Sequence, residues 1–224
     1  FYVSTEEFLQ EITQSDFEDE IILVKGAPEF GFKQIIDMLE ARQHQTVLQV
    51  NLDAVASNYN FFRSKLLPNT KIVCMVKASG YGAGSDELAK TLQDRGASYL
   101  AVAAHDEGAD LRKAGITMPI MVLNPKVTNY KAMFAYNLEP EVFSIEECHE
   151  IIREAEKCGI TNYPVHIKVE TGMHRLGFLK EQLPELINLL QNQEAIRPAS
   201  VFSHLSVADE PLQDEYTMKQ FRYF

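Results

Sequence analysis

One stretch decides the fold that this sequence predicts, and at residues 76–84 it reads Val-Lys-Ala-Ser-Gly-Tyr-Gly-Ala-Gly. It follows the apolar run 71–76, which is typical of a buried strand, and it precedes Ser85, where we expect a helix to begin. A lysine at the carboxyl end of a buried parallel strand is costly unless it has a chemical role. The order of strand, lysine, glycine-rich turn and helix therefore indicates one unit of an α/β fold that carries a candidate active site.

Lys77 is the candidate for that chemical role. Burial lowers the pKa of an amine, and a neutral amine attacks a carbonyl carbon to form a Schiff base. The glycines that follow allow a sharp turn and a close approach of the backbone to a ligand, and the hydroxyl of Tyr81 is suited to bind an anionic group. Together these residues predict an aldehyde cofactor with a phosphate, which is pyridoxal phosphate. The alternative is a surface lysine in a glycine-rich loop.

The composition narrows the class of protein. The chain has 224 residues and is 46% hydrophobic, which is enough for a sizeable core. With 21 Lys and Arg against 32 Asp and Glu, its net charge of −11 argues against nucleic acid or an anionic membrane as a partner. It contains no run of about 18 apolar residues and no signal-peptide pattern, so we expect a cytoplasmic protein without a membrane span. The three cysteines lack metal spacing; we predict no metal site, and buried free thiols at Cys148 and Cys158.

Strands and helices are expected to alternate through most of the chain. The predicted strands are 72–76, 99–103, 119–123, 141–143, 164–169 and 199–203. A further extended segment is expected at 46–50, and Asp53 is the expected cap of the helix that follows it. Six alternating units predict an α/β fold with a parallel sheet: a TIM (β/α)8-type barrel truncated to about six units, with its active site at the carboxyl ends of the strands.

Residues 1–43 differ from the rest of the chain. Ser4 and Glu7 have the spacing of a capping box, residues 20–24 form a short apolar run typical of a strand, and a helix is expected around residues 33–39. One strand and two helices are too few to bury a core alone. We therefore expect a small α/β segment at 1–43, belonging to a preceding domain or docked on the next, and a separate domain at 44–224.

Three predicted strand ends carry polar or reactive groups. Lys77 ends the first strand, residues 168–178 follow the fifth, and residues 202–206 follow the sixth. The fifth strand has a polar face, which is unusual for a buried parallel strand. An interior ion pair of Lys168 with Glu170 or Arg175 would explain it. Other non-catalytic interpretations are a surface Arg175 and a core histidine at position 204.

Together the segments 77–84, 171–178 and 203–205 resemble the pyridoxal-phosphate-dependent alanine racemases, over roughly residues 46–224. The resemblance implies that Lys77 forms the Schiff base and serves as one of two catalytic bases. It implies that Tyr81 binds the cofactor phosphate and that Arg175 contacts the phenolic oxygen and the substrate carboxylate. It assigns further roles to a carbamylated, arginine-orienting Lys168, a pocket-wall Leu123, and His204 below the cofactor. Ser79 stands where the family usually has Asn or Asp.

The activity that this resemblance implies is interconversion of L- and D-alanine for peptidoglycan synthesis. The second base would be a tyrosine from a C-terminal domain of the partner subunit in a homodimer, beyond Phe224. Two alternatives remain open, an amino-acid decarboxylase on the same barrel and a non-catalytic pyridoxal-phosphate-binding barrel. Release of carbon dioxide would identify the first.

A second resemblance concerns the N-terminal segment. Residues 22–27 and 32–36 resemble the closing segment of the ligase that joins D-alanyl-D-alanine to the UDP-muramoyl tripeptide, with departures at Pro28 and Gly31. The ligase's ATP-binding loop is not in the sequence, so no ligase activity is expected of this chain. The two resemblances together imply a parent protein in which a ligase is fused to an alanine racemase.

Overall fold

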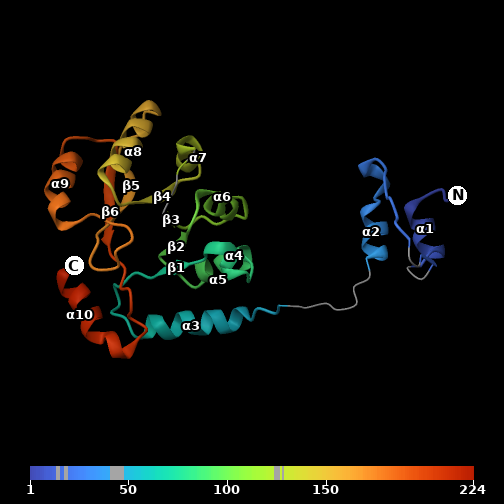
Figure 1. The fold of residues 1–224 in the computed structure, drawn as a ribbon, viewed down its shortest axis with the longest axis horizontal. Helices are drawn as coiled ribbons and strands as arrows, with labels where there is room; N and C mark the ends of the chain where they lie inside the picture. Colours follow the sequence, from blue (N-terminus) through green and yellow to red (C-terminus); the bar gives the residue numbers. More distant parts are fainter. Residues whose placement is uncertain (14–15, 18–19, 41–47, 124–126, 128) are drawn as a thin grey trace. The chain divides into compact units, whose positions relative to one another are not determined.

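The computed structural model of the chain describes residues 1–13, 16–17, 20–40, 48–123, 127 and 129–224 (Figure 1). The chain divides into two compact units, Phe1–Gln49 and Val50–Phe224. The boundary predicted between residues 43 and 44 lies outside the described residues.

The first unit consists of two short helices and a 3-10 turn, which are α1 (Thr5–Glu11), η2 (Pro28–Phe30) and α2 (Lys33–Leu39). The predicted cap of α1 is present, because the Ser4 hydroxyl oxygen accepts a hydrogen bond from the Glu7 N–H at 3.2 Å. The Thr5 hydroxyl donates to the Phe30 carbonyl at 2.5 Å and ties α1 to η2. These contacts define a small unit with little apolar interior.

The prediction of a strand at residues 20–24 is wrong. This segment forms no strand pairing in the described part of the chain, and the side chains of Ile21 and Leu23 are exposed. A strand requires a partner for its backbone hydrogen bonds, and the described part of this unit offers none. The same holds for 48–50, the described part of the strand predicted at 46–50.

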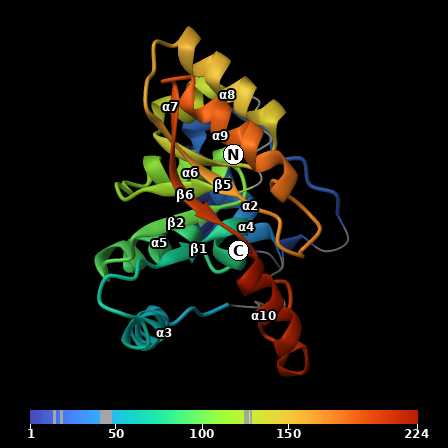
Figure 2. The ribbon, with the colours of Figure 1, turned by 90° about the vertical axis from the view of Figure 1, so that its left-hand side faces the viewer.

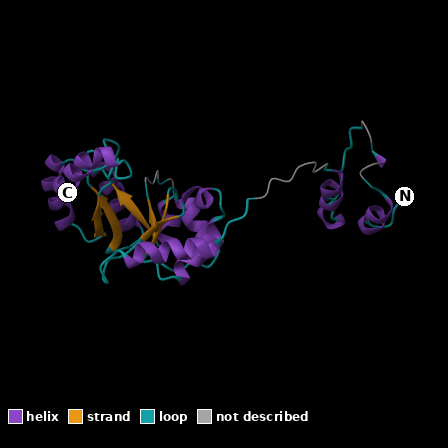
Figure 3. Cartoon of the chain, turned by 90° about the horizontal axis from the view of Figure 1, so that it is seen from below, coloured by secondary structure: helices purple, strands orange, loops and turns teal. Residues whose placement is uncertain are grey.

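The second unit is built on a six-stranded parallel sheet in which each strand pairs with the next one along the chain (Figure 3). The strands are β1 (Val73–Met75), β2 (Tyr99–Val102), β3 (Ile120–Val122), β4 (Leu138–Val142), β5 (Tyr163–Lys168) and β6 (Ile196–Phe202). Among the described residues, β1 and β6 are the edge strands. The prediction of six parallel strands is confirmed, although β4 begins at Leu138 and not at residue 141.

Helices flank the strands and bury one face of the sheet (Figures 1 and 2). The helices and 3-10 turns are α3 (Leu52–Ser64), α4 (Lys77–Tyr81), α5 (Ser85–Asp94), α6 (His105–Lys113), α7 (Tyr130–Ala135), α8 (Ile145–Lys157), η3 (Lys180–Gln182), α9 (Leu183–Gln191), η4 (Pro211–Gln213) and α10 (Asp214–Tyr223). Leu111 of α6 and Ile151 of α8 are fully buried in one cluster with Ile120 and Val142 of the strands. None of the described helices is both long and apolar enough to span a bilayer.

Two predictions about helix ends are corrected by the structure. Asn51, and not Asp53, caps α3, since its side-chain oxygen accepts from the Ala54 N–H at 3.0 Å. Asp53 lies in the first helical turn, where its negative charge favours the helix N-terminus. Cys148 is buried in α8 as expected, but Cys158 is exposed because the helix ends at Lys157.

The unusual polar face of β5 points away from the helices. His166 is almost fully buried there, with Nε2 3.0 Å from Glu139 Oε2 on β4 and Nδ1 2.7 Å from Ser200 Oγ on β6. The Tyr99 hydroxyl on β2 donates to the same Glu139 oxygen at 3.1 Å. Side chains from four strands therefore form one polar layer on this face, and hydrogen bonds compensate its burial.

Candidate active site

Four of the predicted site residues follow strands of the sheet directly or after a short loop. Lys77 follows β1, Leu123 follows β3, Arg175 lies in the loop after β5, and His204 follows β6. The carboxyl ends of parallel strands meet at one edge of a sheet, and this is where (β/α) barrels place their active sites. The topology thus brings residues that are far apart in the sequence to a common edge.

The segment after Lys77 is a left-handed turn. Ala78, Ser79 and Tyr81 have φ values of +52°, +51° and +57°, and Gly80 between them has +63°. For each non-glycine residue this conformation costs about 1–2 kcal/mol. The turn is closed by internal bonds, from the Gly80 N–H to the Val76 carbonyl at 3.1 Å and from the Gly84 N–H to the Ser79 carbonyl at 3.0 Å. Such strain persists only where the surroundings hold it, and it is concentrated at functional sites.

The turn places Lys77 and Tyr81 together. The Lys77 Nζ lies 5.9 Å from the centre of the Tyr81 ring, and Tyr81 is 65% exposed. Lys77 is half-buried, so its amine is only partly shielded from solvent. Because β1 is an edge strand among the described residues, neighbouring strands cover its end from one side only.

Lys168 is the buried cation of the site, with 4% of its surface exposed. Its Nζ lies 3.2 Å from Oε1 of Glu141 on β4 and 5.7 Å from the centre of the Phe202 ring on β6. An interior ion pair was one interpretation of the sequence, but its partner is Glu141 and neither Glu170 nor Arg175. The alternation of Glu139 and Glu141 along β4 matches that of His166 and Lys168 along β5, which indicates strands with complementary charges without fixing which residues pair.

Glu170 binds its own loop. Its carboxylate accepts hydrogen bonds from the N–H of Gly172 and, at 3.3 Å, from the N–H of Arg175. Burial raises the pKa of Glu170, but the backbone N–H groups of His174, Gly172 and Arg175 outweigh it, so the pKa lies below its ordinary value. Glu170 therefore shapes the loop that carries Arg175.

The charged side chains of the site affect the pKa of His204. Its side chain is exposed at the carboxyl edge of the sheet, and its pKa is lowered first by desolvation. The positive charges of Arg175, Lys168 and Lys77 lower that pKa further, against a smaller opposing effect of Glu141. The surroundings of His204 therefore favour its neutral imidazole.

Helix α10 fixes the loops that carry these groups. The Gln220 amide oxygen accepts from the N–H and the hydroxyl of Ser206 at 2.9 and 3.0 Å, and its NH2 group donates to the His204 carbonyl at 3.0 Å. Gln220 is 1% exposed, and its NH2 group also lies 3.4 Å from the Thr171 hydroxyl. No sequence pattern indicates this role, since an amphipathic helix carries many polar residues.

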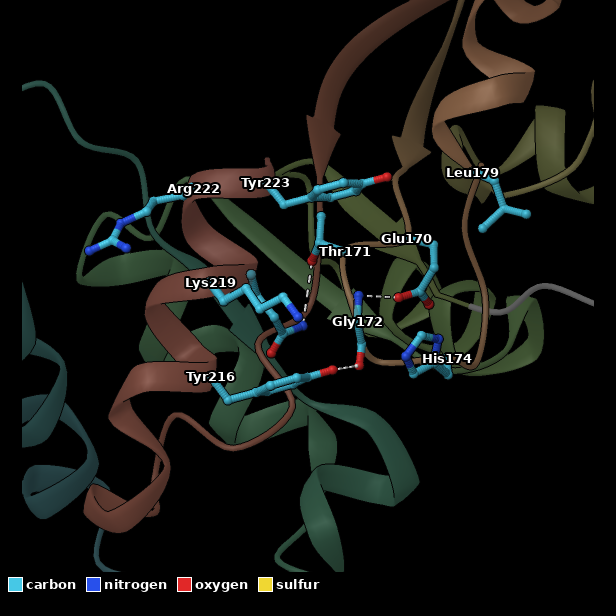
Figure 4. Close-up of a pocket in the computed structure, with 10 residues that line it drawn as sticks. Glu170, Thr171, Gly172, His174, Leu179, Tyr216, Lys219, Arg222 and Tyr223 are labelled. Atoms are coloured by element: carbon cyan, nitrogen blue, oxygen red, sulfur yellow. Dashed lines mark hydrogen bonds between the residues drawn. The ribbon is translucent and has the colours of Figure 1, made fainter.

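A cavity of about 460 Å³ lies between α10 and the loop after β5 (Figure 4). The Tyr216 hydroxyl donates to the Gly172 carbonyl at 2.7 Å along its wall. Its described lining residues are Glu170, Thr171, Gly172, His174, Leu179, Tyr216, Lys219, Gln220, Arg222 and Tyr223. They do not include Lys77, Lys168, Arg175 or His204. The cavity therefore lies beside these predicted site residues and does not contain them. Leu123, half-buried after β3, is not in this lining either.

Residues 50–224 match the family model described as the alanine racemase N-terminal domain. The chain belongs to this family. An alanine racemase of Bacillus subtilis is 41% identical over 169 residues, which are 73% of this chain and 42% of that protein. An alanine racemase of Clostridium novyi is 38% identical over 183 residues, 79% of this chain and 46% of that protein.

Solved alanine racemases have the same fold. The structure from Clostridium difficile superposes with a TM-score of 0.72 at 34% identity and covers 80% of this chain and 48% of its own. That from Bacillus anthracis, with bound L-Ala-P, has a TM-score of 0.71 at 29% identity and covers 78% of this chain and 45% of its own. The prediction of a TIM-type barrel with six β/α units is therefore confirmed. The chain spans less than half the length of these relatives.

Proposed function

We propose that this chain is the barrel part of a pyridoxal-phosphate-dependent alanine racemase, which interconverts L- and D-alanine for peptidoglycan synthesis. The observation that carries the proposal is that Lys77, Arg175 and His204 all follow strands at the carboxyl edge of the sheet, where the buried Lys168 ends β5. Positive charge suits a ligand set that contributes a phosphate, a phenolic oxygen and a substrate carboxylate. The relatives named above as alanine racemases support the activity.

The residues at the carboxyl edge fit the cofactor by their chemistry. We assign the phosphate to the hydroxyl of Tyr81 beside Lys77, and the phenolic oxygen and the substrate carboxylate to Arg175. His204 would lie beneath the ring and Leu123 would form part of the pocket wall. Lys168 would orient Arg175. Carbamylation of Lys168 consumes a neutral amine, so it would require the ion pair with Glu141 to open.

When bound, pyridoxal phosphate would supply the aldehyde that captures an amine and a ring that draws electrons from the substrate α-carbon. Lys77 Nζ then removes the α-proton from one face of the substrate. Arg175, by holding the carboxylate, fixes which face meets Lys77. Inversion requires a proton donor on the opposite face, which we assign to a tyrosine of a further domain in the partner subunit of a homodimer.

The direct test is to locate the lysine that captures the cofactor. We expect the chain, incubated with pyridoxal phosphate, reduced with borohydride and digested, to carry the label on Lys77. A Lys113→Ala chain is the matched control, since Lys113 is exposed on α6, and it should label as the unmodified chain does. Label spread over the lysines in proportion to their exposure would contradict the assignment.

The alternative activities have less support. The relatives reported above are all named alanine racemases, and no contact in the site favours a decarboxylase or a non-catalytic carrier. Incubation of the parent protein with alanine and with basic amino acids separates them. Exchange of the α-hydrogen of alanine supports the racemase, whereas carbon dioxide from a basic amino acid supports a decarboxylase.

For the N-terminal unit, we propose that residues 1–43 close a ligase domain fused ahead of the racemase. The support is that residues 1–49 form a separate unit and that the apolar segment 20–24 forms no strand pairing within its described part. We place the parent in the cytoplasm, where the free thiols of this chain would stay reduced, and the net charge of −11 on this chain argues against nucleic acid or an anionic membrane as a partner. The gene sequence upstream of residue 1 tests the fusion: an ATP-binding loop of a ligase is expected there.

A further inference from the structure

The carboxylate of Glu107, in the first turn of α6, bonds two separate segments of the barrel. Its Oε2 accepts from the N–H of Ala103 at 2.8 Å and of Ala104 at 3.3 Å, which joins α6 to the end of β2. Its Oε1 accepts from the N–H of Ala78 at 2.5 Å. Ala78 is the residue after Lys77, so one half-buried side chain connects β2 and α6 to the start of the left-handed turn.

The turn needs such an anchor. Ala78, Ser79 and Tyr81 have positive φ, which L-residues adopt reluctantly. The internal bonds of the turn use the N–H groups of Gly80, Gly82, Ala83 and Gly84, whereas the N–H of Ala78 points outward to Glu107. A carboxylate that accepts from a backbone N–H makes a strong, charge-assisted hydrogen bond. This bond fixes the backbone direction at the residue from which the Lys77 side chain departs.

We propose that Glu107 is a positioning residue for Lys77, holding the strained turn so that the amine stays beside Tyr81 at the carboxyl edge of the sheet. The effect on cofactor capture rests on the proposed function, but the effect on the turn does not. Glu107 itself does not contact the reacting atoms in this assignment; it acts through the backbone of Ala78.

The chain contains a matched residue without the second contact. In α8, Glu147 occupies the corresponding position, and its Oε2 accepts from the Phe143 N–H at 3.0 Å. Ser144 completes that cap by accepting from the Glu147 N–H at 3.2 Å. Glu147→Gln therefore perturbs a helix start without touching the turn after Lys77. Because burial raises the pKa of Glu147 to about 7, the two variants are compared at a pH above that value, where the Glu147 carboxylate is ionised.

The first experiment measures amide hydrogen exchange in the segment 78–82 of the whole chain, without cofactor. In Glu107→Gln, we expect exchange there to be about tenfold faster, because a charge-assisted bond is replaced by a neutral one and an acceptor is lost. In Glu147→Gln, exchange in this segment should be unchanged. Equal exchange in the two variants would overturn the proposal, and Glu107→Ala should show a larger effect than Glu107→Gln.

The second experiment measures capture of pyridoxal phosphate on Lys77 by reduction and peptide mapping. Glu107→Gln should need about tenfold more cofactor for half-labelling, while Glu147→Gln should match the unmodified chain. A loosened turn with undiminished labelling would show that Glu107 does not position Lys77. If the unmodified chain itself gains no label on Lys77, the proposed function fails, while the exchange result still decides whether Glu107 holds the turn.

Discussion

The two edges of the parallel sheet are built from different interactions. At the amino edge, half-buried Arg112 donates to four backbone carbonyls in the connections before β3 and β4, namely those of Ile116, Met118, Tyr136 and Asn137, at 2.6–3.1 Å. Gln93 accepts there from the N–H of Thr117 and Met118. At the carboxyl edge lie a strained turn, an exposed histidine and the side chains of Lys77, Lys168 and Arg175.

The two edges therefore have different roles: the amino edge stabilises the fold, and the carboxyl edge carries the groups suited to chemistry. The contacts at the amino edge satisfy backbone groups and fix the connections, and they concentrate no like charges. The carboxyl edge gathers Lys77, Arg175 and the ion-paired Lys168, and this positive charge suits an anionic ligand. In (β/α) barrels generally, catalytic residues gather at the carboxyl edge and stabilising ones at the amino edge. Substitutions at the two edges should therefore affect different measurements.

The largest effect is expected from Lys77→Ala at the carboxyl edge. In the parent protein, racemisation of alanine should fall by about 10³-fold or more, because one catalytic base and the amine that captures the cofactor are both lost. The free energy of unfolding should change by less than about 0.5 kcal/mol, since Lys77 is half-buried and makes no ion pair among the described residues. Activity assays and urea unfolding measure the two. Full activity in the variant would refute the assignment of Lys77.

The converse result is expected from Arg112→Ala at the amino edge. Four carbonyls lose a charged donor, so the free energy of unfolding should fall by about 3 kcal/mol. Labelling of Lys77 by pyridoxal phosphate should be unchanged at temperatures where the variant is folded. Arg153→Ala is the control: its side chain is largely exposed beside Glu154, and the loss should be below about 0.5 kcal/mol. Reduced labelling in folded Arg112→Ala would show that the two edges are coupled.

Gln220→Leu tests whether the carboxyl edge has structural contacts of its own. Leucine keeps the apolar volume but leaves the Ser206 N–H and the His204 carbonyl without their partner, so we expect a loss of about 2 kcal/mol. Hydrogen exchange at residues 204–206 should increase, whereas the exposed neighbour Lys219→Ala should leave both measurements unchanged. An unaltered exchange rate would mean that α10 does not hold the loop of His204.

The smallest effect concerns pH. The pKa of Glu170 is lowered in the folded chain, so its ionised form stabilises the fold above the ordinary carboxyl pKa of 4.5. This contribution is lost as the pH falls below 4.5 through the lowered value. We therefore expect the unmodified chain to exceed Glu170→Gln in stability at neutral pH, and the difference to disappear in acid. A pH-independent difference would rule out the backbone contacts of this carboxylate as its cause.

Local signals were sufficient for the framework of the second unit. The alternation of apolar runs with helical segments predicted the six strands, and the spacing of Ser4 and Glu7 predicted the cap of α1. The lysine after β1 was visible because a polar residue interrupts an apolar run there. These features depend on neighbours in the sequence, which a periodic pattern records.

Features that depend on distant partners were predicted poorly. The partner of Lys168 follows from the register that pairs Glu141 with His166, and no local pattern contains that register. The segment 20–24 has the composition of a strand but no strand to pair with in its described surroundings. The positive φ values of Ala78 and Ser79 were not predicted, because only the glycines of that stretch indicate a turn.

The polar layer shared by β4 and β5 has a consequence for recombining this barrel with its relatives. Glu139 is matched to His166, and Glu141 to Lys168, so each charged group on one strand is complemented by the other. A chimaera that imports β4 alone would juxtapose side chains selected in different proteins. The segment from β4 through α8 to β5 should therefore be exchanged as one piece. Crossover points that yield a folded chimaera should lie before β4 or after β5.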